Sequence, residues 1–235
     1  MEKLLENYDR IILFDTETTG LDATKNQIIE IAAIGISASD EVKEMDEFVK
    51  LHSCDTIPAE IVEKTGITDE MVAAGIEETE AVNRFMALFG EKTLLIAYNA
   101  QFDLDFLAHA IIRSAKDQLK LFNTADYLDP LCVAKDRKPY PHKLCDMIDF
   151  YKITDVVNSH RAIDDVKALA AVVEAMETER NDVFKYVNLF GFNPKYGAPE
   201  RRFKKVCYHP QPYGKPKLPY DILPYKAGLW VYETA

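Results

Sequence analysis

This chain of 235 residues has few cysteines, no long hydrophobic run, no internal repeat and no low-complexity tract. Its four cysteines form neither a CxxC pair nor a Cys/His cluster at zinc spacing, so we interpret them as reduced thiols: Cys54, Cys132, Cys145 and Cys207. The apolar run that follows the charged first ten residues is too short for a signal peptide or a membrane span. We therefore expect a cytoplasmic protein with no membrane segment.

Positive charge is also scarce, but only in the first part of the chain. The formal net charge is −11, yet residues 185–235 carry nine Lys and Arg against three Asp and Glu. The same segment holds seven of the eleven prolines, seven of the twelve tyrosines and the single tryptophan, Trp230. This shift predicts a domain over residues 1–184 and a basic, Pro- and Tyr-rich C-terminal extension over residues 185–235. The extension either binds single strands by stacking and charge or wraps over the domain with aromatic anchors.

The order of apolar patterns predicts an α/β fold. Hydrophobic residues make up 48% and charged residues 29% of the chain, as in globular proteins. β-Branched and apolar runs predict five strands. The first begins at residue 11, and the other four cover residues 27–36, 41–51, 93–98 and 119–124. Helical spacing predicts short turns in 58–75 and helices over 78–89, from about 102, over 143–151 and over 161–180. Short connections between the first three strands favour an antiparallel meander, so we expect a mixed five-stranded sheet with helices on both faces.

The stretch IILFDTETTGL places two carboxylates, Asp15 and Glu17, at alternate positions of the first strand. Residues two apart in a strand share a face, so both carboxylates point the same way. Two unit charges ~4 Å apart repel by roughly 4 kcal/mol at an effective dielectric of about 20. Either one acid is protonated or a divalent metal lies between them, and we favour the metal. The alternative is an ordinary strand that ends in a polar turn made by Thr18, Thr19 and Gly20.

Two later segments supply further acidic residues. In NAQFD, Asp103 begins the helix after the fourth strand, at the strand ends where ligands of α/β sheets bind. HRAIDD contains His160, Asp164 and Asp165. On one continuous helix His160 and Asp165 would lie about 140° apart, so they share a site only if His160 precedes the first turn. The helix N-terminus also favours a carboxylate such as Asp165.

The three motifs FDTETTG, NAQFD and HRAIDD resemble, in this order, those of the DEDDh exonucleases. This family includes the epsilon proofreading subunit of bacterial DNA polymerase III. Two other stretches, TGITDEM and HKL, also look like family sequence. The resemblance covers about residues 9–178. It implies a ribonuclease H-like fold and hydrolysis of nucleic acid from the 3′ end.

The resemblance also implies roles for individual residues. Four acids would bind metal and one histidine would be the general base: Asp15, Glu17, Asp103 and Asp165, with His160. The backbone at Thr18 and Gly20 would meet the 3′ hydroxyl, and Leu21 would wedge against the terminal base. Asn99 would contact substrate or only brace the turn before Asp103. Asp164 does not match a ligand position, and His109 and His142 are interpreted as structural or surface residues.

Four carboxylates without thiolates suit two Mg²⁺ or Mn²⁺ ions rather than zinc. We therefore predict a metal-dependent 3′-5′ exonuclease that acts on nucleic acid, DNA more than RNA, in proofreading or repair with a separate polymerase partner chain. One alternative is an exonuclease for RNA or short oligoribonucleotides. A second is a non-catalytic module that binds nucleic acid or a polymerase, although all five catalytic positions are filled. A third is an unrelated metal phosphatase, which would release inorganic phosphate.

Overall fold

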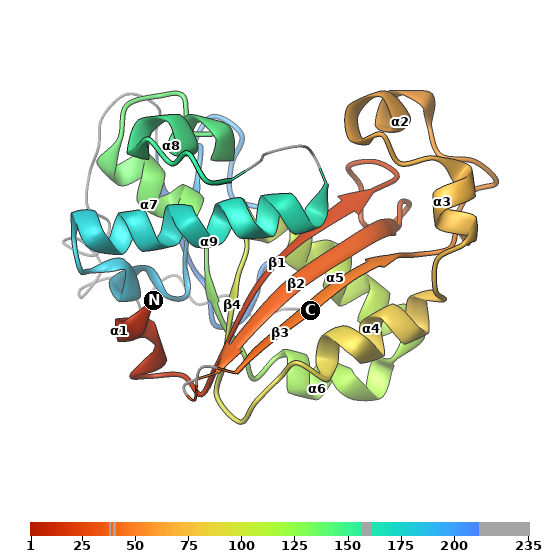
Figure 1. Cartoon of the computed structure of the whole chain (residues 1–235), viewed down its shortest axis with the longest axis horizontal. Coiled ribbons are helices and arrows are strands. Elements are labelled where there is room, and N and C mark those ends of the chain that lie inside the picture. The colour runs from red at the N-terminus through yellow and green to blue at the C-terminus, as the bar shows by residue number, and fades with distance from the viewer. Residues whose placement is uncertain (38, 40, 157–160, 212–235) are drawn as a thin grey trace.

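The computed structural model describes residues 1–37, 39, 41–156 and 161–211 (Figure 1). The strands of its main sheet are β1 (Arg10–Thr18), β2 (Ile28–Ser37), β3 (Val42–Phe48), β4 (Thr93–Ile96) and β5 (Asp126–Leu128). The helices before β5 are α1 (Glu2–Leu5), α2 (Ala59–Thr65), α3 (Asp69–Ala73), α4 (Glu78–Met86), α5 (Ala100–Ser114), η1 (Lys116–Gln118) and α6 (Leu119–Phe122). After β5 come α7 (Pro130–Arg137), α8 (Leu144–Tyr151), α9 (Ala162–Glu179), η2 (Val183–Tyr186), β6 (Leu189–Phe192) and β7 (Cys207–Pro210).

The main sheet has the strand order β3-β2-β1-β4-β5. β2 is antiparallel to β1 and β3, whereas β4 is parallel to β1 and β5. The predicted mixed five-stranded sheet and its antiparallel meander are therefore confirmed. Because β1 and β4 run parallel, their carboxyl ends lie at the same edge of the sheet. The FDTETTG and NAQFD motifs meet at this edge.

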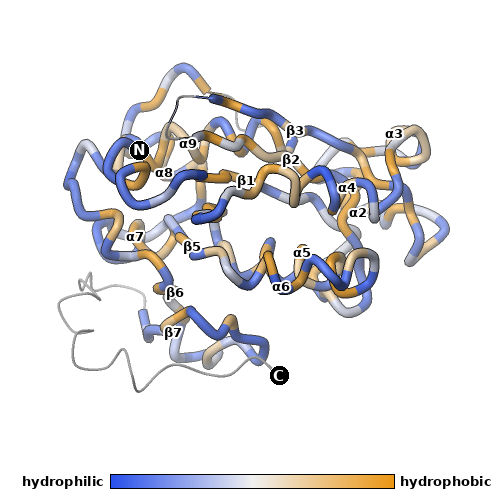
Figure 2. Tube along the Cα trace, turned by 90° about the horizontal axis from the view of Figure 1, so that it is seen from below, coloured by the Kyte–Doolittle hydropathy of each residue, from blue (hydrophilic) through white to orange (hydrophobic). Residues whose placement is uncertain are grey.

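Both faces of the sheet are covered by helices, as predicted. The four apolar residues of β1 are fully buried and alternate between two cores. Ile11 and Leu13 pack in the core that includes α9, whereas Ile12 and Phe14 pack in the core that includes α4 and α5. Figure 2 shows α9 and α5 on opposite sides of the sheet. A strand buried on both faces carries few polar side chains, so the acids at its end are conspicuous.

The prediction of a strand over residues 119–124 is wrong. Residues 119–122 form the short helix α6, and the fifth strand is β5, which pairs with β4 from Asp126 to Leu128. The run LKLF is mostly apolar, and a run this short fits a strand or a turn of helix equally well. The tertiary packing decides, because Phe122 is fully buried beside Tyr127 and Phe203.

The segment after β5 contains a helix for which we made no prediction. α7 begins after Asp129, whose side chain accepts a hydrogen bond from the backbone NH of Leu131. Pro130 occupies the first turn, where its missing NH costs nothing. The Asp-Pro pair is thus a start signal that the sequence does carry. No helix within the described residues is long and apolar enough to cross a membrane.

Residues 187–211 pack against the main domain. β6 and β7 form a small parallel sheet, and Phe190, Phe203 and Tyr208 are buried in the core on the α5 side. The boundary that we predicted at residue 185 falls within η2. The rest of the predicted extension, residues 212–235 with Trp230, lies outside the described residues.

Candidate active site

The end of β1 presents two carboxylates on the face that α9 covers. Asp15 is half-buried and Glu17 is buried, and the fully buried Leu13 two residues earlier shares their face. A register irregularity follows between Glu17 and Thr18. Such a bulge bends the strand and re-aims the side chains beside it. The turn after β1 therefore leaves the sheet immediately beyond the two acids.

A buried glutamate of β2 fixes the start of α9. Glu30 is 0% exposed, and its Oε1 accepts hydrogen bonds from Nε and Nη2 of Arg161 at 2.9 and 2.7 Å. Its Oε2 accepts from the backbone NH of Ala162 at 3.0 Å. These bonds hold the first turn of α9 against the sheet and bring Asp165 to β1. One ligand oxygen from each of Asp15, Glu17 and Asp165 lies within 4.8 Å of the others.

Asp103 reaches the site from α5 in a different way. Its Oδ1 accepts hydrogen bonds from the backbone NH and the Oγ1 of Thr16, at 3.0 and 2.7 Å. α5 can start at this point because Asn99 adopts a left-handed backbone conformation, with φ 63°, which Asn tolerates better than most residues. The backbone NH of Asn99 donates to Asp129 Oδ1 at 2.9 Å. Asp103 thus lines the site but is not part of the three-acid cluster.

A pocket of about 200 Å³ gathers the four predicted metal-binding acids. The other predicted contact residues line it as well: Thr18, Gly20, Leu21 and Asn99. Thr18 Oγ1 donates to the carbonyl of Gly20 at 2.7 Å, which shapes the turn. The Leu21 side chain is 87% exposed, an unusual position for a large apolar group. His160, the predicted base, lies outside the described residues.

Burial and mutual repulsion disfavour ionisation of the acids in the pocket. Burial, then the carboxylates of Asp103 and Glu17, raise the pKa of Asp15 well above its usual value. Burial raises the pKa of Glu17 to about 7 and that of Asp165 to about 6. Burial also raises the pKa of Asp103 to about 7, although the hydrogen bonds from Thr16 act in the opposite direction. The pocket therefore concentrates negative charge that a cation would stabilise.

The donor set fits a hard divalent cation. Asp165 Oδ1 is buried and has no hydrogen-bond partner among the described residues. The three residues of the cluster offer carboxylate oxygens and no sulfur or imidazole nitrogen. Oxygen ligands of this kind suit Mg²⁺ or Mn²⁺. The resemblance to the DEDDh exonucleases predicted these four acids, and the fold brings them into one pocket.

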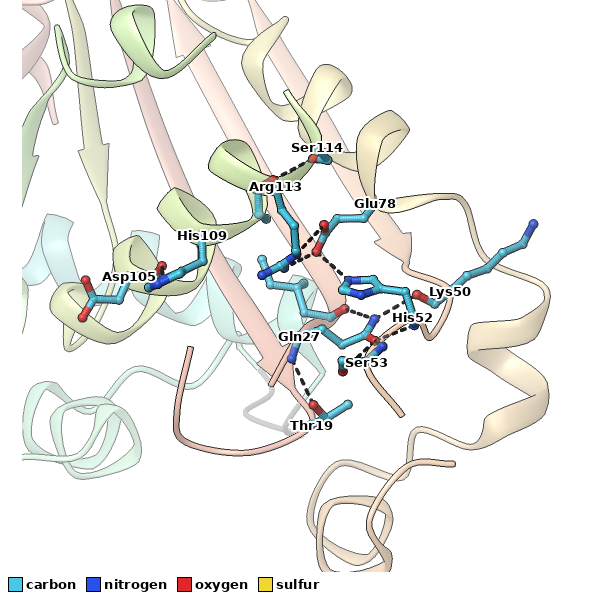
Figure 3. A network of polar contacts seen from close by, with 12 residues as sticks. Thr19, Gln27, Lys50, His52, Ser53, Glu78, Asp105, His109, Arg113 and Ser114 are labelled. Atoms are coloured by element: carbon cyan, nitrogen blue, oxygen red, sulfur yellow. Dashed lines mark hydrogen bonds and ion pairs between the residues drawn. The ribbon is translucent and has the colours of Figure 1, made fainter. Parts of the chain in front are cut away.

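Sequence reasoning missed the residues that position the walls of the pocket. Gln27 is 0% exposed, and its Oε1 accepts from the backbone NH groups of His52 and Ser53 at 2.7 and 2.8 Å (Figure 3). Its backbone NH donates to Thr19 Oγ1 at 3.0 Å. Gln27 thus joins the turn after β1 to the segment that leads to α2, whose Lys64 lines the pocket. The only feature of the sequence that could have pointed to Gln27 is its position as a single amide residue directly before an apolar strand.

Replacement of Gln27 by leucine should lower the free energy of unfolding by about 2–4 kcal/mol, because the fully buried amide loses its hydrogen bonds to His52, Ser53 and the Lys50 carbonyl together. Denaturant unfolding measures the loss. The matched control is Gln118→Leu, which removes an exposed amide bonded to Asn83. A loss below about 1 kcal/mol, the net value of one ordinary hydrogen bond, would show that Gln27 is not an anchor.

The fold and the pocket together define a ribonuclease H-like α/β domain with an acidic site. A family model described as RNase_T exonuclease matches residues 12–173. The chain therefore belongs to this exonuclease family. It is 32% identical over 180 residues to DNA polymerase III PolC-type of Halalkalibacterium halodurans, a match that covers 74% of this chain. The corresponding protein of Bacillus subtilis is 29% identical over 177 residues, again 74% of this chain. The chain spans only 12% of the length of each of these two relatives.

Solved structures share the fold. Exonuclease I of E. coli in complex with a dA16 oligonucleotide superposes with a TM-score of 0.63 at 20% identity, over 76% of this chain and 42% of that chain. Exonuclease I of Methylocaldum szegediense gives a TM-score of 0.63 at 20% identity, over 75% and 42%. This likeness confirms the predicted ribonuclease H-like fold.

Proposed function

We propose that this chain is a metal-dependent 3′-5′ exonuclease domain that releases nucleoside monophosphates from single-stranded DNA. The observation that carries the proposal is the clustering of Asp15, Glu17 and Asp165 within 4.8 Å, with Asp103 lining the same pocket. The cluster comes from β1 and α9, and Asp103 comes from α5, so the fold assembles the pocket. The likeness to PolC-type DNA polymerase III supports a proofreading role beside a polymerase partner.

The four acids would hold two divalent cations, Mg²⁺ or Mn²⁺. When bound, such ions lower the pKa of a water and stabilise the leaving oxygen of a phosphodiester. Asp15 and Glu17 supply carboxylates from one strand, and Asp165 supplies one from α9. Thr16 holds the Asp103 carboxylate in place through two hydrogen bonds. The chain itself thus fixes the oxygen ligands before any substrate binds.

The remaining predicted residues act on the substrate. His160, with a typical pKa of about 6.5, would accept the proton of the attacking water. The backbone at Thr18 and Gly20 would meet the 3′ hydroxyl, while the exposed Leu21 would pack against the terminal base. Asn99 would contact the same nucleotide from the start of α5.

Oligonucleotides labelled at either end, incubated with Mg²⁺ or Mn²⁺, test the function. We expect DNA labelled at the 3′ end to lose its label first, as a nucleoside monophosphate. Release of inorganic phosphate, release of the 5′ label first, or no hydrolysis would contradict the proposal. RNA of the same sequence, assayed in parallel, measures the preference for the sugar. Faster cleavage of RNA than of DNA would show that RNA is the preferred substrate.

Lys64 of α2 is the only cationic side chain among the described residues that line the acidic pocket. It is exposed, and its charge lowers the pKa of Glu17 and of Asp165 against the larger effect of burial. A cation placed here repels bound metal and attracts a phosphate. Lys64→Ala should therefore tighten Mn²⁺ binding by about two- to fivefold and weaken binding of a single strand.

These opposite changes distinguish Lys64 from a merely structural residue. The plot of log affinity for the strand against log salt concentration should become less steep by about 0.7. The control variant Lys43→Ala removes an exposed charge from β3 outside the pocket. Metal and strand affinities that shift in the same direction would overturn the assignment.

A further inference from the structure

A second groove adjoins the acidic pocket and has a different chemistry. Its volume is about 500 Å³, and it is lined by residues of the β4–α5 turn, of α7 and of the segment before α8. Tyr98 and Asn99 line both this groove and the acidic pocket. The two spaces therefore adjoin at the start of α5. A chain whose end lies among the acids would enter this groove.

Two lysines give the groove a positive charge. Lys135 is half-buried in the last turn of α7, and Lys143 is exposed at the start of α8. Within the described part of the chain, neither ammonium group takes part in a salt bridge. Lys138 of the same region, by contrast, is paired with Glu179. The charge of Lys135 also acts on the buried carboxyl of Asp129 behind the groove. Two ammonium groups that form no ion pair among the described residues, in a chain of net charge −11, are suited to an anionic ligand.

An exposed aromatic residue, Tyr140, also lines the groove, and it falls between the two lysines in the sequence. Tyr140 is 69% exposed and follows the last turn of α7. Its ring contacts the buried His142 edge to face, with centroids 5.9 Å apart. Aromatic rings of this kind stack on unpaired bases of any sequence.

The wall of the groove beneath Tyr140 is rigid. His142 is 8% exposed, and its Nε2 lies 2.8 Å from the carbonyl oxygen of Lys138. The hydroxyl of Tyr98 donates to the carbonyl of His142 at 2.7 Å. This bond ties the segment before α8 to the turn that carries Asn99. The groove is therefore formed before a ligand binds, which lowers the entropic cost of binding.

We infer that this groove binds the nucleotides on the 5′ side of the scissile bond, as an unpaired strand. Lys135 and Lys143 contact its phosphates, and Tyr140 stacks on a base. The inference rests on the proposed function, because that function places the 3′ end among the acids. It explains how an acidic protein retains a polyanion: the charge complementarity lies beside the acidic pocket, in the groove, rather than over the whole surface. A base pair would not expose a face to Tyr140, so the groove selects single strands.

The test compares two substrates that differ in whether they reach the groove. The p-nitrophenyl ester of thymidine 5′-monophosphate occupies the acidic pocket alone, whereas the oligonucleotide dT8 extends into the groove. For the double variant Lys135→Gln/Lys143→Gln, we expect KM for dT8 to rise about tenfold or more, with a salt dependence less steep by about 1.4. For Tyr140→Ala, we expect the ratio of kcat/KM for dT8 to that for the ester to fall by about 5- to 100-fold. Tyr140→Trp should keep the ratio.

Matched controls are Lys116→Gln/Lys120→Gln and Tyr196→Ala, which change exposed residues outside the groove. Groove variants that match these controls would overturn the inference while the proposed function stands. A loss that is equal for dT8 and the ester would also overturn it, because the damage would then be in the acidic pocket. Absence of hydrolysis of both substrates by the unaltered protein would instead overturn the proposed function. Thermal unfolding of each variant verifies that it is folded.

Discussion

Asp15→Asn should abolish hydrolysis and, at the same time, stabilise the metal-free protein. Asp15 is surrounded by Glu17, Asp103 and Asp165, and burial together with these charges raises its pKa well above the usual value. The amide is neutral at every pH, so the metal-free fold no longer bears the cost of ionising or protonating a buried carboxyl at this position. A gain of about 1–2 kcal/mol would raise Tm by about 2–8 °C. Activity should fall by more than about a thousandfold, because a metal ligand contributes several kcal/mol.

Calorimetry with and without Mn²⁺ measures both effects. Mn²⁺ should raise the Tm of the unaltered protein by mass action but leave that of Asp15→Asn nearly unchanged. The control Asp117→Asn changes an exposed acid of η1 and should behave as the unaltered protein does. A lower Tm for metal-free Asp15→Asn would show that the carboxylates do not repel one another in this pocket.

The same acids set how stability depends on pH. Without metal, the folded protein binds more protons than the unfolded chain between the ordinary carboxyl pKa of about 4 and the raised pKa of Glu17 and Asp103, about 7. Stability of the metal-free protein should therefore fall as pH rises from about 4 to about 7. Asp15→Asn should reduce this fall, because it removes one of the repelling charges. A metal-free stability that rises with pH would contradict the raised pKa values.

His160→Ala should lower kcat by about 10²- to 10⁴-fold, the usual contribution of a general base. The Mn²⁺-induced rise in Tm should persist, because the acids remain. The pH profile separates a base from a structural residue: the rising limb near the typical histidine pKa of about 6.5 should disappear in the variant. His109→Ala is the control, since His109 is bonded to the backbone of Asp105 and to Arg201. A variant that keeps this limb at near-normal turnover would remove His160 from the mechanism.

Local patterns predicted most of the fold. The apolar runs of β1 and β2 and the helical spacing of α4, α5, α8 and α9 are strong and long, and these elements were confirmed. The wrong strand over residues 119–124 came from a short apolar run whose conformation is decided by the packing around Phe122. The small β6–β7 sheet was not predicted, because the prediction for the residues beyond 185 was based on their composition and not on a periodic pattern.

The acids could be predicted, but their supports could not. Asp15 and Glu17 stand two residues apart after a buried strand, which is visible in one stretch of sequence. Glu30 and Arg161 are 131 residues apart, and only the fold reveals that they hold α9 to the sheet. Lys64 carries no signal at all, since an exposed lysine in a short helix is ordinary. Sequence motifs thus predict which acids belong to the site, whereas long-range contacts determine where their side chains point.

Diffraction from crystals soaked with Mn²⁺, recorded at a wavelength where manganese scatters anomalously, measures the central point directly. We expect an anomalous peak between the carboxylates of Asp15, Glu17 and Asp165, with oxygens at about 2.0–2.2 Å. We expect no such peak in crystals of Asp15→Asn. Manganese bound only elsewhere, or absent from between these three carboxylates at saturating concentration, would contradict the account.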